Sequence, residues 1–314
     1  MKIYSKLIIL SAAMAIISSC AKKEETLTPS NINLTYKLPQ GNNAFDQTIL
    51  NYYKTYGSYM LYQFTERDAY WTPTGWKRPI LNDVAGSWSG IDVAPAESSA
   101  VEAQIDLINK SLFTLYPAAF LKKYLPAKLL LCNKVDSIYT TGVFTPTYVT
   151  TKNIKKIPAF YSYDNIYINY GNSTVGQLTA AEKLAFLARL NQVFFQSINE
   201  RAMILPSMEF INSADYVSTN STQAVAYSKG LIANTNNTIT PTADWNAYVM
   251  AMVTLSEADL NRSVINTDKS AVGILNVTKD SNGIIKKRYA IVRNYFINNF
   301  QVDLQAIGNK ARGL

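Results

Sequence analysis

The spacing of hydrophobic residues along the chain predicts helices on either side of a central group of short strands. Apolar residues at helical intervals predict five amphipathic helices. These are 44–64, 100–115 (continued at 120–124), 179–205, 244–255 and 284–304. Short runs rich in Tyr, Val and Ile predict strands between 128 and 170, the first over 128–132. The pattern therefore predicts one α+β domain, with helices around a small mixed sheet.

The helix that begins at Thr179 has the clearest start signal. Thr179 and Glu182 have the spacing of a capping box, in which the hydroxyl accepts from a free amide and the carboxylate reaches back. An apolar stripe follows, formed by Leu184, Leu187, Leu190, Phe194 and Ile198. This stripe predicts that one face of the helix lies in the core.

The N-terminal segment has the pattern of a lipoprotein signal. Lys2 and Lys6 precede an apolar run over 7–17, and small residues then lead directly to Cys20. The apolar run is too short for a membrane-spanning helix. We therefore expect residues 1–19 to be a signal peptide and Cys20 to carry lipid. The alternative is an ordinary secretory signal with a chance cysteine.

The polar stretch that follows predicts a lipidated flexible tether over 20–35, because it cannot bury enough apolar surface to fold. Residues 36–314 are then expected to form the domain. Residues 21–25 (AKKEE) resemble the export signal of Bacteroidota lipoproteins. This resemblance implies a location in the outer membrane, lipid-anchored and at the cell surface.

The charge of the chain is basic but not concentrated. It has 30 Lys+Arg against 22 Asp+Glu, and the two lysines removed with the signal reduce the formal excess from +8 to +6. The basic residues are spread out apart from 286–288, so we expect no nucleic-acid binding. Cys132 ends the apolar run 129–132 and is expected to be a buried structural thiol.

The chain has no histidine. This excludes Ser-His-Asp and Cys-His catalytic arrangements, and any zinc site built on imidazole. Paired carboxylates can still hydrolyse glycosides, since that reaction requires only two acids at a set separation. Glu66 with Asp68 and Glu257 with Asp259 are candidates, although acids two residues apart are commonly surface charges.

Aromatic residues in a fixed order mark three segments, which are Leu38–Trp76, Tyr116–Cys132 and Pro206–Tyr216. Together they resemble the substrate import-associated zinc metallohydrolase lipoproteins of Bacteroidota, also described as zinc-binding metallopeptidases. The resemblance implies a zincin-like metallopeptidase-type domain. It also implies that the protein acts together with a TonB-dependent transporter and a substrate-binding lipoprotein in the uptake of glycans or peptides.

That family carries His-Glu-x-x-His on the helix before the third segment. Two imidazoles one turn apart bind zinc, and the glutamate takes a proton from the zinc-bound water. Two alignments place this motif on either Asn191, Gln192 and Phe195 or Val193, Phe194 and Ser197. Neither alignment supplies a histidine or the base. We therefore expect no metal ligand, no catalytic residue and no cofactor other than the lipid on Cys20.

Four aromatic residues lie in a Pro- and Gly-rich region and could form a ligand platform. They are Tyr70, Trp71, Trp76 and Trp88. Exposed Tyr and Trp side chains provide large rigid contact surfaces at low entropic cost, which suits sugars and peptides. The alternative is that these rings pack the N-terminal helix against the strands.

Three functions are compatible with these patterns. The first is a lipid-anchored binding or accessory subunit of a nutrient-uptake system, with the metallohydrolase-like fold but no metal. The second is an active hydrolase that uses carboxylates or a displaced metal site. The third is a purely structural partner of the transporter.

Overall fold

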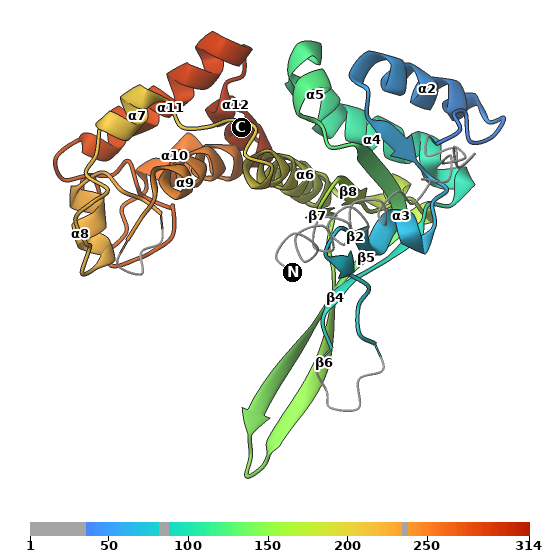
Figure 1. Cartoon of the computed structure of the whole chain (residues 1–314), viewed down its shortest axis with the longest axis horizontal. Coiled ribbons are helices and arrows are strands. Elements are labelled where there is room, and N and C mark those ends of the chain that lie inside the picture. The colour runs from blue at the N-terminus through green and yellow to red at the C-terminus, as the bar shows by residue number, and fades with distance from the viewer. Residues whose placement is uncertain (1–35, 82–87, 234–237) are drawn as a thin grey trace, which may run out of the picture. The chain divides into compact units, whose positions relative to one another are not determined.

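The computed structural model describes residues 36–81, 88–233 and 238–314. The expected signal peptide, the tether and Cys20 lie outside these residues. Residues 38–314 pack together as one unit, and this unit is described below. Its architecture is α+β, with helices around a mixed sheet, as the sequence predicted (Figure 1).

Strand β5 (Lys128–Phe144) is the centre of the sheet. Its first residues pair in parallel with β1 (Tyr59–Leu61) and with β8 (Asn165–Ile168). Strand β7 (Ala159–Ser162) runs antiparallel to β8 and is the outer strand on that side. The side chains at the start of β5 and throughout β8 are buried, so this part of the sheet belongs to the core.

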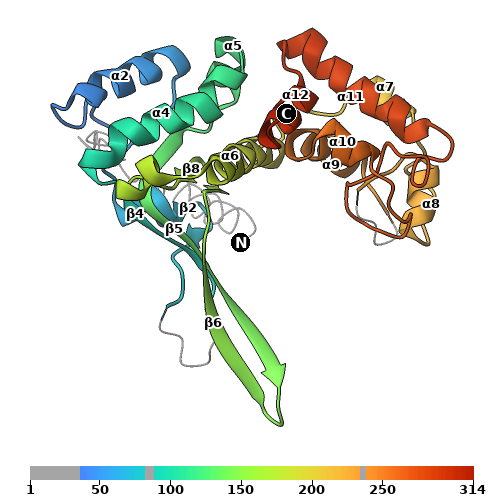
Figure 2. The same cartoon turned by 180° about the vertical axis from the view of Figure 1, so that it is seen from behind.

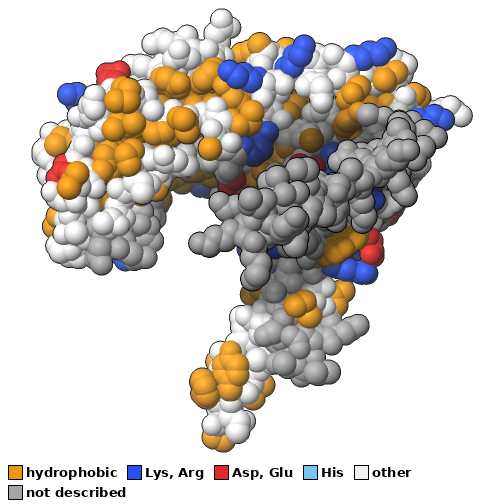
Figure 3. Space-filling model, in the orientation of Figure 1, with side chains coloured by type: hydrophobic (Ala, Val, Ile, Leu, Met, Phe, Trp, Pro, Cys, Tyr) orange, Lys and Arg blue, Asp and Glu red, His pale blue; other side chains and the backbone are white. Residues whose placement is uncertain are grey.

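Farther along the chain, β5 and β6 (Tyr148–Lys156) form a hairpin that extends away from the helices (Figures 1 and 2). Strand β4 (Gly90–Pro95) pairs antiparallel with β5 as far as Ile138. Within the described residues, the distal part of the hairpin is therefore two-stranded. Hydrophobic side chains gather near its end (Figure 3).

Helix α6 (Ala180–Glu200) lies between two groups of helices (Figures 1 and 2). It packs against β7, α4, α9 and α12. The longer helices around it are α2 (Ala44–Tyr56), α4 (Val101–Ser111), α5 (Ala118–Tyr124), α9 (Pro241–Thr254), α11 (Ile284–Phe300) and α12 (Leu304–Ala311). None of the helices in the described ranges is long and apolar enough to cross a bilayer.

The remaining elements are short. The helices are α3 (Glu66–Tyr70), α7 (Met208–Asn212), α8 (Gln223–Ser228) and α10 (Glu257–Asn261), with 3-10 turns η2 (Ser98–Ala100), η3 (Phe113–Leu115) and η4 (Ser173–Gln177). A separate two-stranded sheet consists of β2 (Trp71–Thr72) and β3 (Gly75–Trp76). This small sheet and α3 carry three of the four candidate platform residues, which are Tyr70, Trp71 and Trp76.

The start of α6 confirms the predicted capping box. The hydroxyl of Thr179 accepts from the amide of Glu182 at 3.2 Å, and the carboxylate of Glu182 accepts from the amide of Thr179 at 2.8 Å. The buried surface of α6 is wider than the predicted stripe, because Phe186, Val193 and Phe195 are also buried. Core therefore surrounds the second half of the helix on most sides.

The predicted ends of three helices were wrong. The helix predicted over 179–205 ends at Glu200, and Ala202 just beyond it has a left-handed φ of 51°. The helix predicted over 44–64 ends at Gly57, whose φ of 74° is left-handed and whose amide donates to the carbonyl of Tyr53. The residues that follow become β1, because their side chains enter the core of the sheet. The helix predicted over 284–304 ends at Gln301, which has a φ of 57°, and α12 begins after it.

Candidate functional site

The first alignment puts Asn191 at the position of a zinc ligand, but this buried side chain is used for structural hydrogen bonds. Its Oδ1 accepts from the hydroxyl of Tyr116 at 2.6 Å. Its Nδ2 donates to the carbonyls of Ser111 and Leu187 at 2.9 and 2.8 Å. Burial raises the pKa of Tyr116 well above its usual value, so the hydroxyl keeps its proton. Asn191 therefore joins α6 to the segment that follows α4.

The other two positions of this alignment lie in different surroundings. Gln192 is half-buried and accepts from Nη1 of Arg189 at 2.8 Å. Phe195 is fully buried, with its ring centroid 5.8 Å from Phe194 and 6.0 Å from Phe296. These three described positions hold no pair of donor groups that could share a metal ion.

The second alignment falls on the same packed turn of α6. Val193 and Phe194 have no exposed area. The hydroxyl of Ser197 donates to the carbonyl of Phe194 at 2.7 Å and accepts from Nη2 of Arg201 at 3.1 Å. The side chains at both alignments therefore stabilise the helix and the core.

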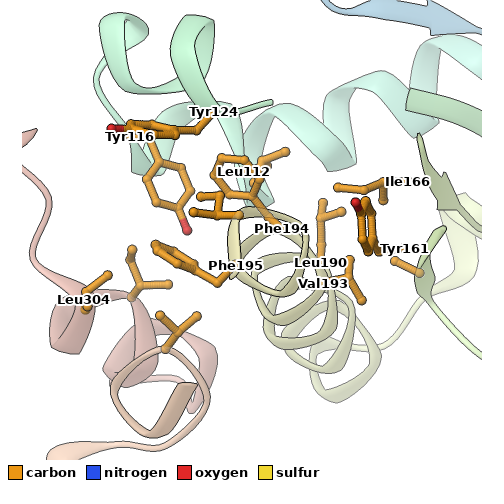
Figure 4. Close-up of a cluster of buried hydrophobic side chains, with 14 of the residues drawn as sticks. Leu112, Tyr116, Tyr124, Tyr161, Ile166, Leu190, Val193, Phe194, Phe195 and Leu304 are labelled. Atoms are coloured by element: carbon orange, nitrogen blue, oxygen red, sulfur yellow. The ribbon is translucent and has the colours of Figure 1, made fainter. Parts of the chain in front are cut away.

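Figure 4 shows how this turn of α6 is enclosed. Leu190 and Val193 face Tyr161 of the sheet, whereas Phe195 lies on the side of Tyr116. The rings of Tyr116 and Phe195 have their centroids 6.1 Å apart. Packed side chains thus occupy the space beside the turn that would carry the motif.

A cavity of about 500 Å³ lies beside the last turns of α6. It is bounded by α6, by β7 and its turn into β8, and by residues 76–80 and 89–91. The aromatic lining consists of Tyr70, Trp76, Phe160, Tyr161, Tyr163 and Tyr167. The polar lining includes Lys77, Arg78, Ser162, Gln196 and Glu200. Aromatic faces beside a few polar groups are typical of sites for small ligands.

Two rings of this lining are open to solvent. Trp76 is 57% exposed and Tyr163 is 49% exposed. Tyr163 occupies the turn between β7 and β8 with a φ of 49°, and its carbonyl accepts from the hydroxyl of Tyr161. No pattern in the sequence around Tyr163 marked it as a site residue. Gln196 donates to Glu200 at 2.7 Å, which places an amide and a carboxylate at the same edge of the cavity.

The structure brings two of the four predicted platform residues to the cavity. Tyr70 is buried, and its hydroxyl accepts from the amide of Val93 at 3.0 Å, so it is a supporting part of the lining. Trp76 provides an accessible ring. Trp71 is exposed and pairs with Trp76 across β2 and β3, whereas Trp88 is half-buried. Trp71 and Trp88 do not belong to the lining.

The chain was also compared with known proteins. Residues 86–305 match the family described as "Putative zinc-binding metallo-peptidase". The chain belongs to this family. A crystal structure of a putative zinc-binding metallo-peptidase from Bacteroides caccae is similar over 86% of this chain and 93% of its own, with 12% identity and a TM-score of 0.42. Comparison with curated proteins finds no match.

The family's description implies zinc, but the residues at the motif do not fit this ion. Within the described ranges, His, Cys, Asp and Glu residues form no group of three or more that could hold a metal. Burial raises the pKa of the Cys132 thiol, so it stays neutral and is a poor ligand. The carboxylate of Glu200, at the end of α6, accepts a hydrogen bond from Gln196. A tetrahedral site needs several such ligands directed at one point.

In this family member, Arg288 holds the segment Pro206–Tyr216 in place. Its guanidinium donates to the carbonyl of Phe210 at 3.1 Å, to the hydroxyl of Ser213 at 2.6 Å and to the hydroxyl of Tyr216. It also forms a fully buried ion pair with Asp244, with 2.8 Å between Nη2 and Oδ2. In the sequence Arg288 stands out only as part of the basic run 286–288, because its partners are far away in the chain.

The candidate carboxylate pairs have structural partners. Glu66 forms an ion pair with Arg78 at 2.8 Å. Asp68 accepts from the amide of Thr65 at 2.7 Å and caps α3. Asp259 forms the same kind of cap at the start of α10. These contacts account for three of the four acids without a catalytic role.

Proposed function

We propose that this chain is a lipid-anchored outer-membrane protein, catalytically inactive, that serves as a binding or accessory subunit of a nutrient-uptake system. The family membership supports a metallopeptidase-type fold. The expected lipid on Cys20 would attach the protein to the outer membrane, at the cell surface. Its partners would be a TonB-dependent transporter and a substrate-binding lipoprotein.

The observation that carries this proposal is the burial of the motif turn. In both alignments the positions of the zinc ligands and the base are occupied by Asn, Gln, Phe, Val or Ser, none of which is a usual zinc ligand or a general base. These side chains also make the hydrogen bonds and ring contacts of the core. The protein would therefore work without a metal cofactor and without the family's hydrolysis step.

The ligand would bind in the cavity beside α6. The exposed rings of Trp76 and Tyr163 offer faces on which a sugar or an aromatic side chain can stack. Ser162, Gln196 and Glu200 would supply hydrogen bonds to a hydroxyl or amide group. The site would thus take a segment of glycan or peptide. Among the described residues of the lining, Glu200 is the single acid, so glycoside hydrolysis by two carboxylates finds no support there.

Zinc content and ligand binding test the proposal separately. The protein purified from Ala21 onward should contain no stoichiometric zinc and should not cleave peptides. Stoichiometric zinc with turnover would overturn the proposal in favour of an active hydrolase.

A screen of glycans and peptides by calorimetry should then find a ligand whose affinity falls in Trp76→Ala and Tyr163→Ala. Tyr139→Ala is the matched control, because Tyr139 is 43% exposed but lies on the β5–β6 hairpin. Equal losses in Tyr139→Ala and Tyr163→Ala would remove the cavity as the site. Absence of any ligand would favour a purely structural partner of the transporter.

A further inference from the structure

The end of the β5–β6 hairpin exposes hydrophobic side chains that the proposed function does not use. Phe144 is 79% exposed and Val143 is 62% exposed. Tyr148 and Val149, on the other strand, are 56% and 48% exposed. In Figure 3 these hydrophobic atoms lie at the end of the hairpin, at a distance from the helices. Large exposed apolar groups that gather in this way indicate a contact surface.

These side chains cover both faces of the hairpin end. Val143 pairs with Val149, and Phe144 pairs with Tyr148. Directly opposed residues of an antiparallel pair share a face, and successive residues alternate between faces. The valine pair therefore lies on one face and the aromatic pair on the other. A groove on a partner protein would cover one face of the hairpin and leave the other face exposed. Lipid chains, in contrast, surround an inserted tip on all sides and cover both faces.

The position of Tyr148 suits the boundary between lipid and water. A Cβ on Gly142 would lie only 2.2 Å from the Tyr148 hydroxyl, so the tyrosine ring lies across the backbone at this glycine. Gly142 comes before Phe144 on β5, so the ring extends back from the tip. Its polar hydroxyl then points toward the stem, while its apolar body stays near the tip. Tyrosine is enriched at membrane interfaces in this type of arrangement.

The charges of the hairpin complement an anionic surface. Residues 137–163 contain no acidic residue, and residues 139–151 contain no charge of either sign. Three lysines follow on β6, and Lys152 and Lys155 are the two nearer to the tip. At the rise of a strand they stand about 13 Å and about 23 Å from Tyr148. Lys152 donates a 3.5 Å hydrogen bond to the carbonyl of Leu81, and Lys155 is exposed.

We infer that the end of the β5–β6 hairpin inserts into the surface of a lipid bilayer with anionic headgroups. Val143, Phe144, Tyr148 and Val149 enter the boundary of the acyl chains, and Lys152 lies at the level of the phosphates. The inference does not depend on lipidation of Cys20.

The test uses the chain from Ala21 onward, without lipid, and sedimentation with vesicles. The vesicles contain phosphatidylcholine alone or with one-third phosphatidylglycerol. We expect binding to the anionic vesicles that weakens with salt. The double variant Phe144→Ser/Val149→Ser should bind at least about tenfold more weakly, because it removes two apolar side chains from the inserted surface. The control Ile265→Ser/Val277→Ser changes exposed residues elsewhere in the fold and should bind like the parent.

A second measurement locates the tip directly. In Phe144→Trp, brominated acyl chains should quench fluorescence beyond the level seen in the parent protein. Absence of vesicle binding by the parent, undiminished binding by the tip variant, or equal loss in the control would overturn the inference. Dimerisation of the parent that the tip variant abolishes, without vesicle binding, would instead assign this surface to a second copy of the chain.

Discussion

The hydroxyl of Tyr116 donates to Oδ1 of Asn191 over 2.6 Å, and both side chains are buried. The two residues are 75 positions apart in the chain, so this hydrogen bond joins distant segments at the turn of α6 where one alignment puts a zinc ligand. Nδ2 of Asn191 also has two acceptors, so both ends of the amide are hydrogen-bonded within the protein. The relationship gives the amide at this position a structural role.

Removal of the Asn191 amide should destabilise the protein. In Asn191→Ala the hydroxyl of Tyr116 and the carbonyl of Ser111 lose buried partners, and we expect a loss of about 2–3 kcal/mol in the free energy of unfolding. Gln192→Ala, at a half-buried neighbour, should cost less than about 1 kcal/mol. Urea unfolding of both variants checks this. Similar losses in the two variants would show that the buried hydrogen bonds of Asn191 contribute no more to stability than the partly exposed contact of Gln192.

Restoring the motif should not restore a zinc site. The triple variant Asn191→His/Gln192→Glu/Phe195→His replaces a buried ring and a hydrogen-bonded amide, and loss of the Phe195 packing alone should cost up to about 3–5 kcal/mol, the cost of full truncation. We expect a destabilised protein with no stoichiometric zinc by elemental analysis. Phe195→Leu serves as the control and should lose less stability. One bound zinc per chain in a stably folded triple variant would contradict the packing argument.

The buried ion pair should be sensitive to removal of one partner. Arg288→Met leaves Asp244 buried without its cation and should cost about 3–5 kcal/mol. Arg78→Met breaks the exposed pair with Glu66 and should cost less than about 1 kcal/mol. Thermal and urea unfolding measure the stability of both variants. If Arg288→Met were as mild as Arg78→Met, Arg288 would not be the residue that fixes the segment Pro206–Tyr216.

Acid should weaken the contact between Asp268 and Lys279. Hydrogen bonds from Ser270, together with the Lys279 ammonium, lower the pKa of Asp268 to about 2. The unfolded value is about 3.9, so this carboxylate stabilises the fold above about pH 4 and loses its effect as the pH falls toward 2.

The thermal midpoint of Asp268→Asn should therefore lie below that of the parent at neutral pH, and the difference should shrink in acid. Asp106→Asn, which alters an exposed helix pair with Lys110, is the control. A difference between Asp268→Asn and the parent that stays constant from pH 6 to pH 2 would argue against this role of Asp268.

Local signals in the sequence predicted α6 well, because a capping box and an apolar stripe depend on residues close together in the chain. The end of α2 was missed because Gly57 and the burial of β1 in the sheet override an apolar pattern that continues with helical spacing. Strand β5 was expected as separate short strands. Its length depends on pairing with β6 outside the core, which burial patterns do not report.

The site was predicted less completely than the fold. The aromatic cluster around Trp76 could be recognised from composition, but its partner Tyr163 comes from a turn nearly ninety residues later. Likewise, nothing local to Arg288 indicates that it binds Phe210 and Asp244. Such contacts arise only when the sheet and helices assemble, so a single sequence does not display them.

The ring packing at Phe194 and Phe195 also bears on how this chain could change over many generations. Each step toward a histidine-based zinc site on this turn would have to place a polar ligand in a fully buried aromatic cluster, and zinc would stabilise the fold only after several ligands were present together. The intermediate sequences would be less stable than either end point. The packing of these two rings therefore separates this sequence from a histidine-based zinc site by several substitutions that would have to occur together.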